Sequence, residues 1–298
     1  MKIKRKLTKT KWGGYQYSPL PSNEELQQYY GKRYYNEDLG SYSAQYTEEQ
    51  IMWWRVRAEL VAMPLENARP RGERGAFLDV GCGEGWLMAA MYKRGHAVRG
   101  FDFSEVGISR WHPYLLPYFT QGNIYALLGE QCALGGCYDI IFLGNVIEHV
   151  ISPEDLVQKI NTLLAPNGVF VVVAPNDFSD LQMHLLNIGA AEEPWWLSFP
   201  DHLSYFNHNS MKYFLEDMGF TIRKVVGDFP VEFNLFSSLT NYVKDRSVGQ
   251  KIHQRRMRVE NYLFDLDPQK LLDIYTTLGT MGVGRNIIYY CSRKNGEK

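Results

Sequence analysis

Residues 77–85, Phe-Leu-Asp-Val-Gly-Cys-Gly-Glu-Gly, decide the fold of this chain. The apolar run at 77–80 predicts a buried strand, and three glycines at alternate positions follow it at once. Residues 86–94 then carry apolar side chains at helical spacing, and a second apolar run at 96–101 ends in Asp102. A strand, a glycine turn, a helix and a strand in this order are typical of a doubly wound α/β sheet, which binds ligands at the carboxyl ends of its strands.

Two acidic residues beside the glycine turn indicate the kind of ligand. Asp79 stands just before Gly81, where a carboxylate would repel a pyrophosphate but could receive an ammonium group. Asp102 is placed to accept hydrogen bonds from ribose hydroxyls. The glycines allow the backbone to approach the ligand without a Cβ in the way. S-Adenosylmethionine, an amino acid joined to a nucleoside, fits both acids.

A dinucleotide is the competing ligand. Its fingerprint, Gly-x-Gly-x-x-Gly, requires a third glycine that permits close packing of the helix on the strand beside a pyrophosphate. Trp86 occupies that position here, and Asp79 adds an unfavourable charge. Both residues therefore disfavour a nicotinamide-dependent dehydrogenase.

Three segments resemble the class I S-adenosylmethionine-dependent methyltransferases. Residues 79–85 are similar to motif I of that class, and residues 100–104 are similar to its acidic loop after the second strand. Residues 139–150 resemble the fourth-strand segment of the subgroup that includes the ubiquinone-pathway O-methyltransferases. The C-terminal half also resembles methyltransferases of bacterial surface-glycan and secondary metabolism. The resemblance implies a Rossmann-like, doubly wound seven-stranded sheet whose last strand is antiparallel.

The cofactor site is predicted at the tips of the first four strands of this sheet. Phe103 follows the ribose acid and would lie near the adenine, with Ile124 packed on the adenine face. Asn123 stands where the family usually carries an acid that meets the adenine amino group, and an amide oxygen can also serve. The predicted cofactor-binding residues are Asp79, Gly81, Cys82, Gly83, Gly85, Asp102, Phe103, Asn123, Ile124 and Asn145.

Methyl transfer itself requires mainly positioning, because the sulfonium already makes the methyl group electrophilic. A hydroxyl acceptor must also lose a proton, for which an imidazole is the usual agent. His149 follows the fourth strand, and His202 lies in the loop after the fifth. Both are candidate catalytic bases, and a hydrogen-bonded structural histidine is the alternative for each. We expect no metal, because the His, Asp and Glu residues show no metal-ligand spacing.

The rest of the chain is predicted to form additions to the cofactor-binding core. The aromatic residues near the N-terminus either bury a cap against the core or line an acceptor pocket. The segment before the last strand is interpreted as packing or dimer surface. The alternative is acceptor binding through the polar groups of Asn241-Tyr242 and Arg285-Asn286. The expected regions are an N-terminal aromatic-rich cap (1–66), the core (67–227), a helical insertion (228–284), and a closing strand with tail (285–298).

The composition of the 298-residue chain excludes some classes of binding partner. A net charge of −1 gives no overall field to recruit nucleic acid or an anionic membrane. No apolar stretch approaches the ~20 residues that span a bilayer, and the four cysteines show no paired spacing. We therefore expect a cytoplasmic protein with neither nucleic acid nor membrane as a partner.

The sequence thus predicts a metal-independent, S-adenosylmethionine-dependent methyltransferase that acts on oxygen in a small molecule or sugar. N- or C-methylation of a small metabolite is the first alternative. A non-catalytic S-adenosylmethionine-binding protein is the second, because a fold does not by itself define a function. A homodimer is left open.

Overall fold

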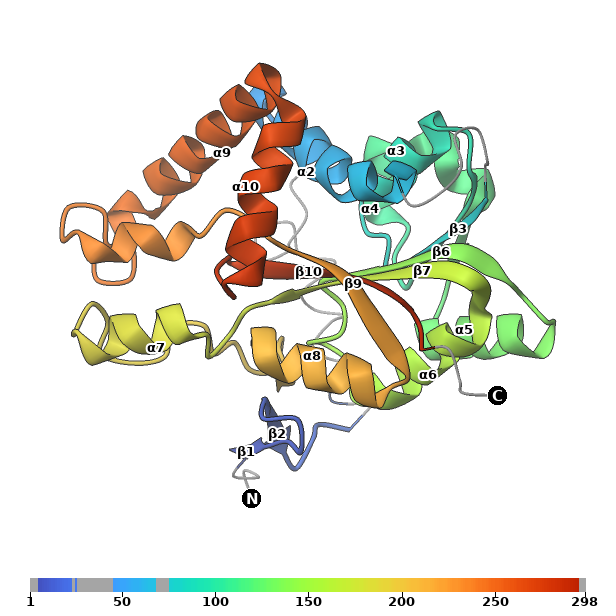
Figure 1. The fold of residues 1–298 in the computed structure, drawn as a ribbon, viewed down its shortest axis with the longest axis horizontal. Coiled ribbons are helices and arrows are strands. Elements are labelled where there is room, and N and C mark those ends of the chain that lie inside the picture. Colours follow the sequence, from blue (N-terminus) through green and yellow to red (C-terminus); the bar gives the residue numbers. More distant parts are fainter. Residues whose placement is uncertain (1–4, 23–24, 26–44, 68–74, 295–298) are drawn as a thin grey trace.

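A seven-stranded sheet forms the centre of the protein (Figure 1). The computed structural model describes residues 5–22, 25, 45–67 and 75–294. The strands of this sheet are β3 (Ala76–Val80), β4 (Ala97–Asp102), β5 (Phe119–Gln121), β6 (Tyr138–Gly144), β7 (Leu164–Pro175), β9 (Phe220–Gly227) and β10 (Asn286–Arg293). Their order is β5-β4-β3-β6-β7-β10-β9. The first five strands along the chain pair in parallel, whereas β10 is antiparallel to both of its neighbours. The predicted sheet is confirmed.

Helices cover both faces of the sheet, so its central strands must be apolar on both sides. Ile140 and Ile141 of β6 accordingly face different core clusters, and both are buried. The helices on one face are α5 (Ile124–Ala133), α6 (Pro153–Leu163) and α8 (His208–Asp217). Those on the other are α2 (Glu48–Asn67), α3 (Trp86–Lys93), α4 (Val106–Trp111) and α10 (Pro268–Thr280).

A second sheet, not predicted from the sequence, attaches the N-terminal segment to the loop after β7. Strand β1 (Lys6–Lys9) pairs with β2 (Tyr15–Ser18), which in turn pairs with β8 (Ser204–Tyr205). Trp12 in the turn between β1 and β2 packs edge-on against Phe214 of α8, with ring centroids 4.8 Å apart. This small sheet fixes the backbone that directly follows His202.

The segment before β10 contains η2 (Val231–Phe236), η3 (Arg246–Val248), α9 (Gly249–Leu266) and α10. Two further short helices, η1 (Pro113–Tyr118) and α7 (Asp180–Asn187), lie elsewhere in the chain. Helix α9 packs against α2, so the N-terminal region and this segment meet. Tyr29, Tyr30, Tyr34, Tyr35 and Tyr42 of the predicted aromatic cap lie outside the described residues. The division into four regions stays a prediction.

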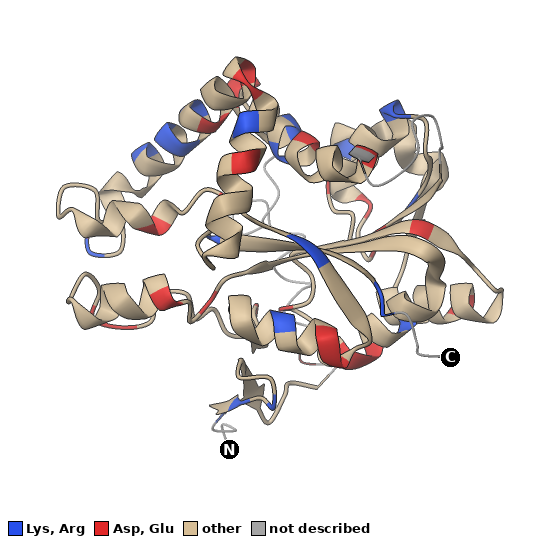
Figure 2. Cartoon of the chain, in the orientation of Figure 1, with Lys and Arg blue, Asp and Glu red and all other residues tan. Residues whose placement is uncertain are grey.

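Basic and acidic residues are interspersed along the helices of both layers (Figure 2). Within the part of the chain that the structure describes, no helix is both long and apolar enough to cross a membrane. The four cysteines all lie in that part, and all are free thiols.

Candidate functional site

A cavity of about 1490 Å³ lies at the carboxyl ends of β3, β4 and β6. Small-molecule sites usually measure roughly 300–1,000 Å³, so this cavity has room for a cofactor and a second molecule. Nine of the ten predicted cofactor-binding residues line it, and the exception is Gly85. The lining also includes side chains of α2, α9 and α10, which the sequence did not connect with the cofactor motif.

The glycine turn between β3 and α3 forms the floor of the cavity. Gly81, Gly83 and Gly85 have φ angles of 77°, 53° and 76°, in the left-handed region that favours glycine. A Cβ on Gly81 would lie only 2.4 Å from Cγ2 of Val146. The turn therefore needs glycine both for its backbone conformation and for its contact with the segment that follows β6.

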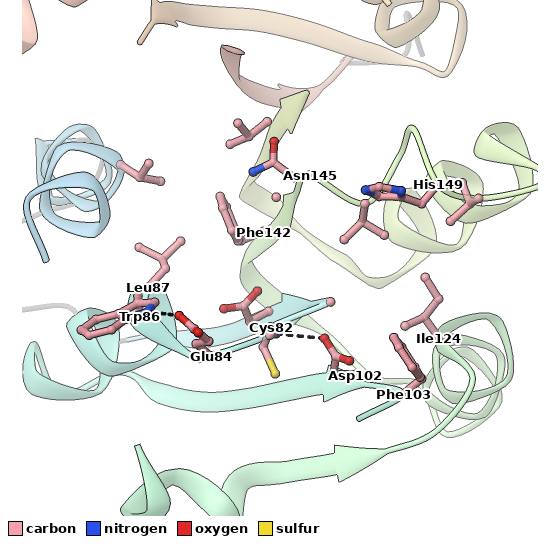
Figure 3. A pocket seen from close by; sticks show the side chains of 18 of the residues that line it. Cys82, Glu84, Trp86, Leu87, Asp102, Phe103, Ile124, Phe142, Asn145 and His149 are labelled. Carbon is pink, nitrogen blue, oxygen red and sulfur yellow. Dashed lines mark hydrogen bonds between the residues drawn. The ribbon is translucent and has the colours of Figure 1, made fainter. Parts of the chain in front are cut away.

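Asp102 lies at the end of β4 and supports the glycine turn directly. Its Oδ2 accepts a hydrogen bond from the backbone N–H of Gly83 at 2.9 Å (Figure 3). Its Oδ1 accepts one from the N–H of Ser104 at 3.1 Å. Burial raises the pKa of Asp102 above its usual value, although these N–H donors oppose the shift. A carboxylate offers about four acceptor positions, so ribose hydroxyls can still be bound here.

Asp79 is more isolated than Asp102. Only 2% of its surface is exposed, and its Oδ1 has no hydrogen-bond partner among the described residues. Burial, reinforced by the charge of Asp102, raises the pKa of Asp79 to about 8. A buried acceptor without a donor is costly, and a ligand ammonium group would supply the donor that is lacking. The geometry therefore suits the contact predicted from the sequence.

The remaining predicted cofactor residues surround this pair. Phe103 is 43% exposed and, with Ile124, faces the cavity across from His149 (Figure 3). Asn145 follows β6 with a left-handed φ of 52°. Burial raises the pKa of the Cys82 thiol, so Cys82 is unsuited to act as a thiolate nucleophile.

Asn123 has a local role that the sequence reading did not anticipate. Its side-chain oxygen caps α5 by accepting hydrogen bonds from the N–H groups of Tyr125 and Ala126. Asn and Asp are preferred N-caps for this reason. The predicted contact between this oxygen and an adenine amino group therefore competes with a helix cap that is already formed.

Glu84, inside the glycine turn, is a cavity residue that sequence reasoning missed. Its Oε1 accepts a hydrogen bond from Tyr46 at 2.9 Å, and its Oε2 accepts one from Trp86 Nε1 at 2.7 Å. The Trp54 ring lies parallel to Trp86, with centroids 6.4 Å apart. Tyr46, Trp54 and Trp86 all line the cavity and form an aromatic wall. Tyr46 and Trp54 come from the N-terminal region, so some aromatic residues of that region do reach the cavity.

A buried charge network lies beside this aromatic wall, where the Arg57 guanidinium is 5.8 Å from the centroid of the Trp54 ring. Its members come from α2, α9 and α10 and from Asp228, which follows β9. Arg256 donates to Asp228 at 3.0 Å and to Glu260 at 2.8 Å. Arg57 lies 3.5 Å from Asp228, and Tyr275 donates to Glu260 at 2.8 Å. Except for Arg256, these residues line the cavity, whereas the previously considered Asn241 and Arg285 do not. The acceptor role considered for Asn241 and Arg285 stays a prediction.

The two candidate catalytic histidines lie side by side. The ring centroids of His149 and His202 are 4.9 Å apart, with the planes nearly perpendicular. His149 lines the cavity, and its Nδ1 is 2.7 Å from the carbonyl oxygen of Asp201. The N–H groups of Leu203 and Ser204 donate to the carbonyl of Glu148, which ties the loop after β7 to the end of β6.

Carboxylates surround this histidine pair. His149 Nε2 lies 3.7 Å from Glu148 Oε1, and His202 Nδ1 lies 3.8 Å from Asp177 Oδ2. Burial raises the pKa of Glu148. Burial would also raise the pKa of Asp177, but Arg285 and His202 together outweigh burial, and the pKa is lowered. Burial alone lowers the pKa of His202, yet the neighbouring Asp177 and Glu148 raise it above its usual value.

Comparison with known proteins identifies the family. The family model described as "Methyltransferase domain" matches residues 52–225. The ubiquinone biosynthesis O-methyltransferase of Cupriavidus pinatubonensis is 25% identical over 220 residues, which cover 69% of this chain and 86% of that protein. The protein of the same name from Histophilus somni is 37% identical over 98 residues, which cover 31% of this chain and 41% of that protein. This chain thus matches less than half of the second relative's length.

The fold is also found among solved structures. The crystal structure of the [4+2]-cyclase SpnF has a TM-score of 0.50 and 14% identity to this chain, over 93% of this chain and 99% of that one. At this identity the likeness shows a shared fold alone.

The fold and the cavity define a class I S-adenosylmethionine-dependent methyltransferase. The chain belongs to the methyltransferase domain family, because that family's model covers more than half of it. The predicted enzyme class and the cofactor, S-adenosylmethionine, are confirmed. The roles of individual site residues stay predictions.

Proposed function

We propose that this enzyme transfers the methyl group of S-adenosylmethionine to a hydroxyl oxygen of a small molecule. The oxygen forms a bond to the methyl carbon as the carbon–sulfur bond breaks, which gives a methyl ether, S-adenosylhomocysteine and a proton. The observation that carries the proposal is one cavity with Asp79 and Asp102 on its floor and His149 on its wall. The names of the two relatives above, both O-methyltransferases, favour oxygen over nitrogen or carbon.

The acceptor is proposed to bind in the part of the cavity that the cofactor leaves free. The aromatic wall of Tyr46, Trp54 and Trp86 offers flat apolar faces, and Arg57 and Asp228 offer polar groups beside it. Aromatic faces bordered by polar groups suit both a phenol and a sugar. We propose a hydroxylated small molecule and include sugars among the acceptors.

The acceptor hydroxyl is proposed to lose its proton at the His149–His202 pair. We expect His202→Ala to lower kcat by roughly 100-fold or more, the usual contribution of acid–base catalysis. Affinity for S-adenosylhomocysteine should change by less than about threefold, because no predicted cofactor contact is removed. His184→Ala, which alters an exposed histidine of α7, is the matched control and should leave both quantities unchanged.

The test uses radiolabelled S-adenosylmethionine with panels of phenols, sugars and amines. Methyl ethers among the products would support the proposal, and label found only on nitrogen or carbon would overturn it. Cofactor binding without label transfer to any panel member would favour the non-catalytic alternative. If His202→Ala weakened cofactor binding as much as turnover, the proposed role of the pair would be lost.

Two further proposals concern assembly and location. We propose a cytoplasmic enzyme, which the four free thiols support. The homodimer considered from the sequence stays a proposal, and light scattering of the full chain tests it. A mass equal to one chain across a tenfold concentration range would rule that dimer out.

A further inference from the structure

We infer that Glu148, His149 and His202 bind one divalent transition-metal ion at the wall of the cavity. The sequence predicted no metal, because Glu148 and His149 are neighbours at the end of β6 whereas His202 comes from the loop after β7. The structure brings one potential ligand atom from each residue to within 4.8 Å of the others. The inference rests on this cluster, on the groups that orient its members, and on an unsatisfied carboxylate oxygen.

The distances are short enough for modest side-chain movement to close the site. Bonds of zinc to nitrogen or oxygen measure about 2.0–2.2 Å, which places ligand atoms roughly 3.0–3.5 Å apart. His149 Nε2 and Glu148 Oε1 are already 3.7 Å apart. A movement of about 1 Å among exchangeable rotamers is small compared with the reach of a Glu or His side chain.

The groups behind the histidines are those that orient metal-binding imidazoles. A ligating histidine usually points its other ring nitrogen at a backbone carbonyl or a carboxylate. His149 does so with the Asp201 carbonyl at 2.7 Å, which leaves Nε2 for a ligand. His202 lies 3.8 Å from Asp177, a carboxylate that Arg285 holds in place at 2.7 Å. The first arrangement is formed, whereas His202 Nδ1 has no hydrogen-bond partner among the described residues and needs a slight approach to Asp177 to complete the second.

Glu148 supplies the independent sign that a ligand is needed. Only 2% of its surface is exposed, and its Oε2 has no hydrogen-bond partner among the described residues. A buried carboxylate is retained in proteins when it is paired or bound to a metal. A divalent cation between Glu148 and the two rings would compensate this oxygen. Two imidazoles and one carboxylate suit zinc and similar divalent metals.

Three protein ligands leave at least one coordination position open, as in catalytic metal sites. His149 lines the cavity, so an acceptor can approach the ion from that side. This consequence rests on the proposed function: a hydroxyl bound to the ion loses its proton more readily. The two histidines would then act as ligands instead of as a base. Favoured acceptors would carry a hydroxyl that can coordinate a metal.

Zinc binding tests the site without any acceptor. The full-length protein is treated with EDTA, exchanged into metal-free buffer, and titrated with Zn²⁺ by calorimetry. We expect one equivalent to bind, and Glu148→Gln and His202→Ala to weaken that binding at least about 100-fold. Asp177→Asn, which alters an orienting group, should weaken it by roughly 10–100-fold. His184→Ala should bind zinc as the unchanged protein does.

Folding is checked by S-adenosylhomocysteine binding, which each variant should keep. Substitution of zinc by Co²⁺ provides a second readout, because its visible absorption reports nitrogen and oxygen ligation, and Glu148→Gln should alter that spectrum. Absence of stoichiometric zinc binding, or equal binding by the unchanged protein, Glu148→Gln and His202→Ala, would overturn the metal site. If the unchanged protein bound no zinc but His202→Ala still lost turnover, the metal site would be rejected and the proposed function would stand. Zinc binding with methylation of nitrogen would instead reject only the O-methylation proposal.

Discussion

The proposed cofactor half and the proposed acceptor half of the cavity are built in different ways. The first is assembled mainly from one continuous stretch, residues 79–103, in which a glycine turn joins two parallel strands. The second combines α2 with the end of β9, α9 and α10, which lie far from α2 in the sequence, and it shares Trp86 of α3 with the first. Local backbone geometry therefore fixes the cofactor half, whereas tertiary packing fixes the acceptor half. Substitutions in the two halves should have separable effects.

The largest expected effect is that of Gly81→Ala. A non-glycine residue at a left-handed φ costs roughly 1–2 kcal/mol, and the new Cβ would also lie 2.4 Å from Val146. The floor of the cavity must then shift, so we expect a lower unfolding temperature and S-adenosylhomocysteine binding weakened more than about 100-fold. Thermal unfolding and calorimetry measure the two quantities.

Gly189→Ala is the matched control for this change. Gly189 has a φ of 71°, but a Cβ there would meet no atom within 4 Å. The backbone strain is thus similar and the steric contact is missing. Gly189→Ala should lower stability modestly and preserve cofactor binding. Equal cofactor binding by both alanine variants would show that the close approach to Val146 is unimportant.

Asp102→Asn and Trp54→Ala each alter one half of the cavity, and cofactor affinity and acceptor KM are measured for both variants. Asp102→Asn removes a charged acceptor, worth about 1.5–3 kcal/mol in hydrogen bonds, so S-adenosylhomocysteine should bind roughly 10–100-fold more weakly. Trp54→Ala removes part of the aromatic wall and should raise the acceptor KM by about tenfold, with cofactor affinity within about twofold of the original. Similar losses of cofactor affinity in both variants would contradict the separation of the halves.

The same difference explains how much could be predicted from the sequence. Asp79, Asp102 and the glycines are close in the chain, so a strand–turn–helix pattern placed them correctly at one edge of the sheet. Glu84 lies within that pattern, but its role depends on Tyr46, which arrives from the N-terminal region. The spacing of residues along the chain does not predict contacts between residues that are so far apart in the sequence.

The proposed acceptor half shows more clearly what could not be predicted from the sequence. Asp228, Glu260 and Tyr275 are brought together by the packing of α10 on β9 and α9, and their separate sequence contexts gave no common pattern. Likewise, Glu148 and His202 meet only because backbone hydrogen bonds join the loop after β7 to the end of β6. Apolar periodicity predicts that such segments pack, but it does not determine which polar side chains they bring face to face.

The smallest expected effect is a pH dependence within the cofactor half. Burial raises the pKa of Asp79 to about 8, so most of the free protein carries a protonated Asp79 at neutral pH. A ligand ammonium group beside it favours the carboxylate and lowers that pKa in the complex. Binding then releases a proton, so affinity rises as pH increases towards 8. From pH 7 to about 7.7 we expect a roughly fourfold gain for S-adenosylhomocysteine.

Calorimetry in two buffers of different ionisation enthalpy measures this proton directly. At pH 7 nearly one proton should be released per S-adenosylhomocysteine bound, and Asp79→Asn should release none, because it has no proton to lose in this range. Asp102→Asn is the informative comparison, because the charge of Asp102 is one of the two causes of the raised pKa of Asp79. That variant should bind more weakly and still release a proton. A binding enthalpy independent of buffer in the unchanged protein would mean that the ammonium group does not meet Asp79, and would move the amino-acid end of the cofactor elsewhere in the cavity.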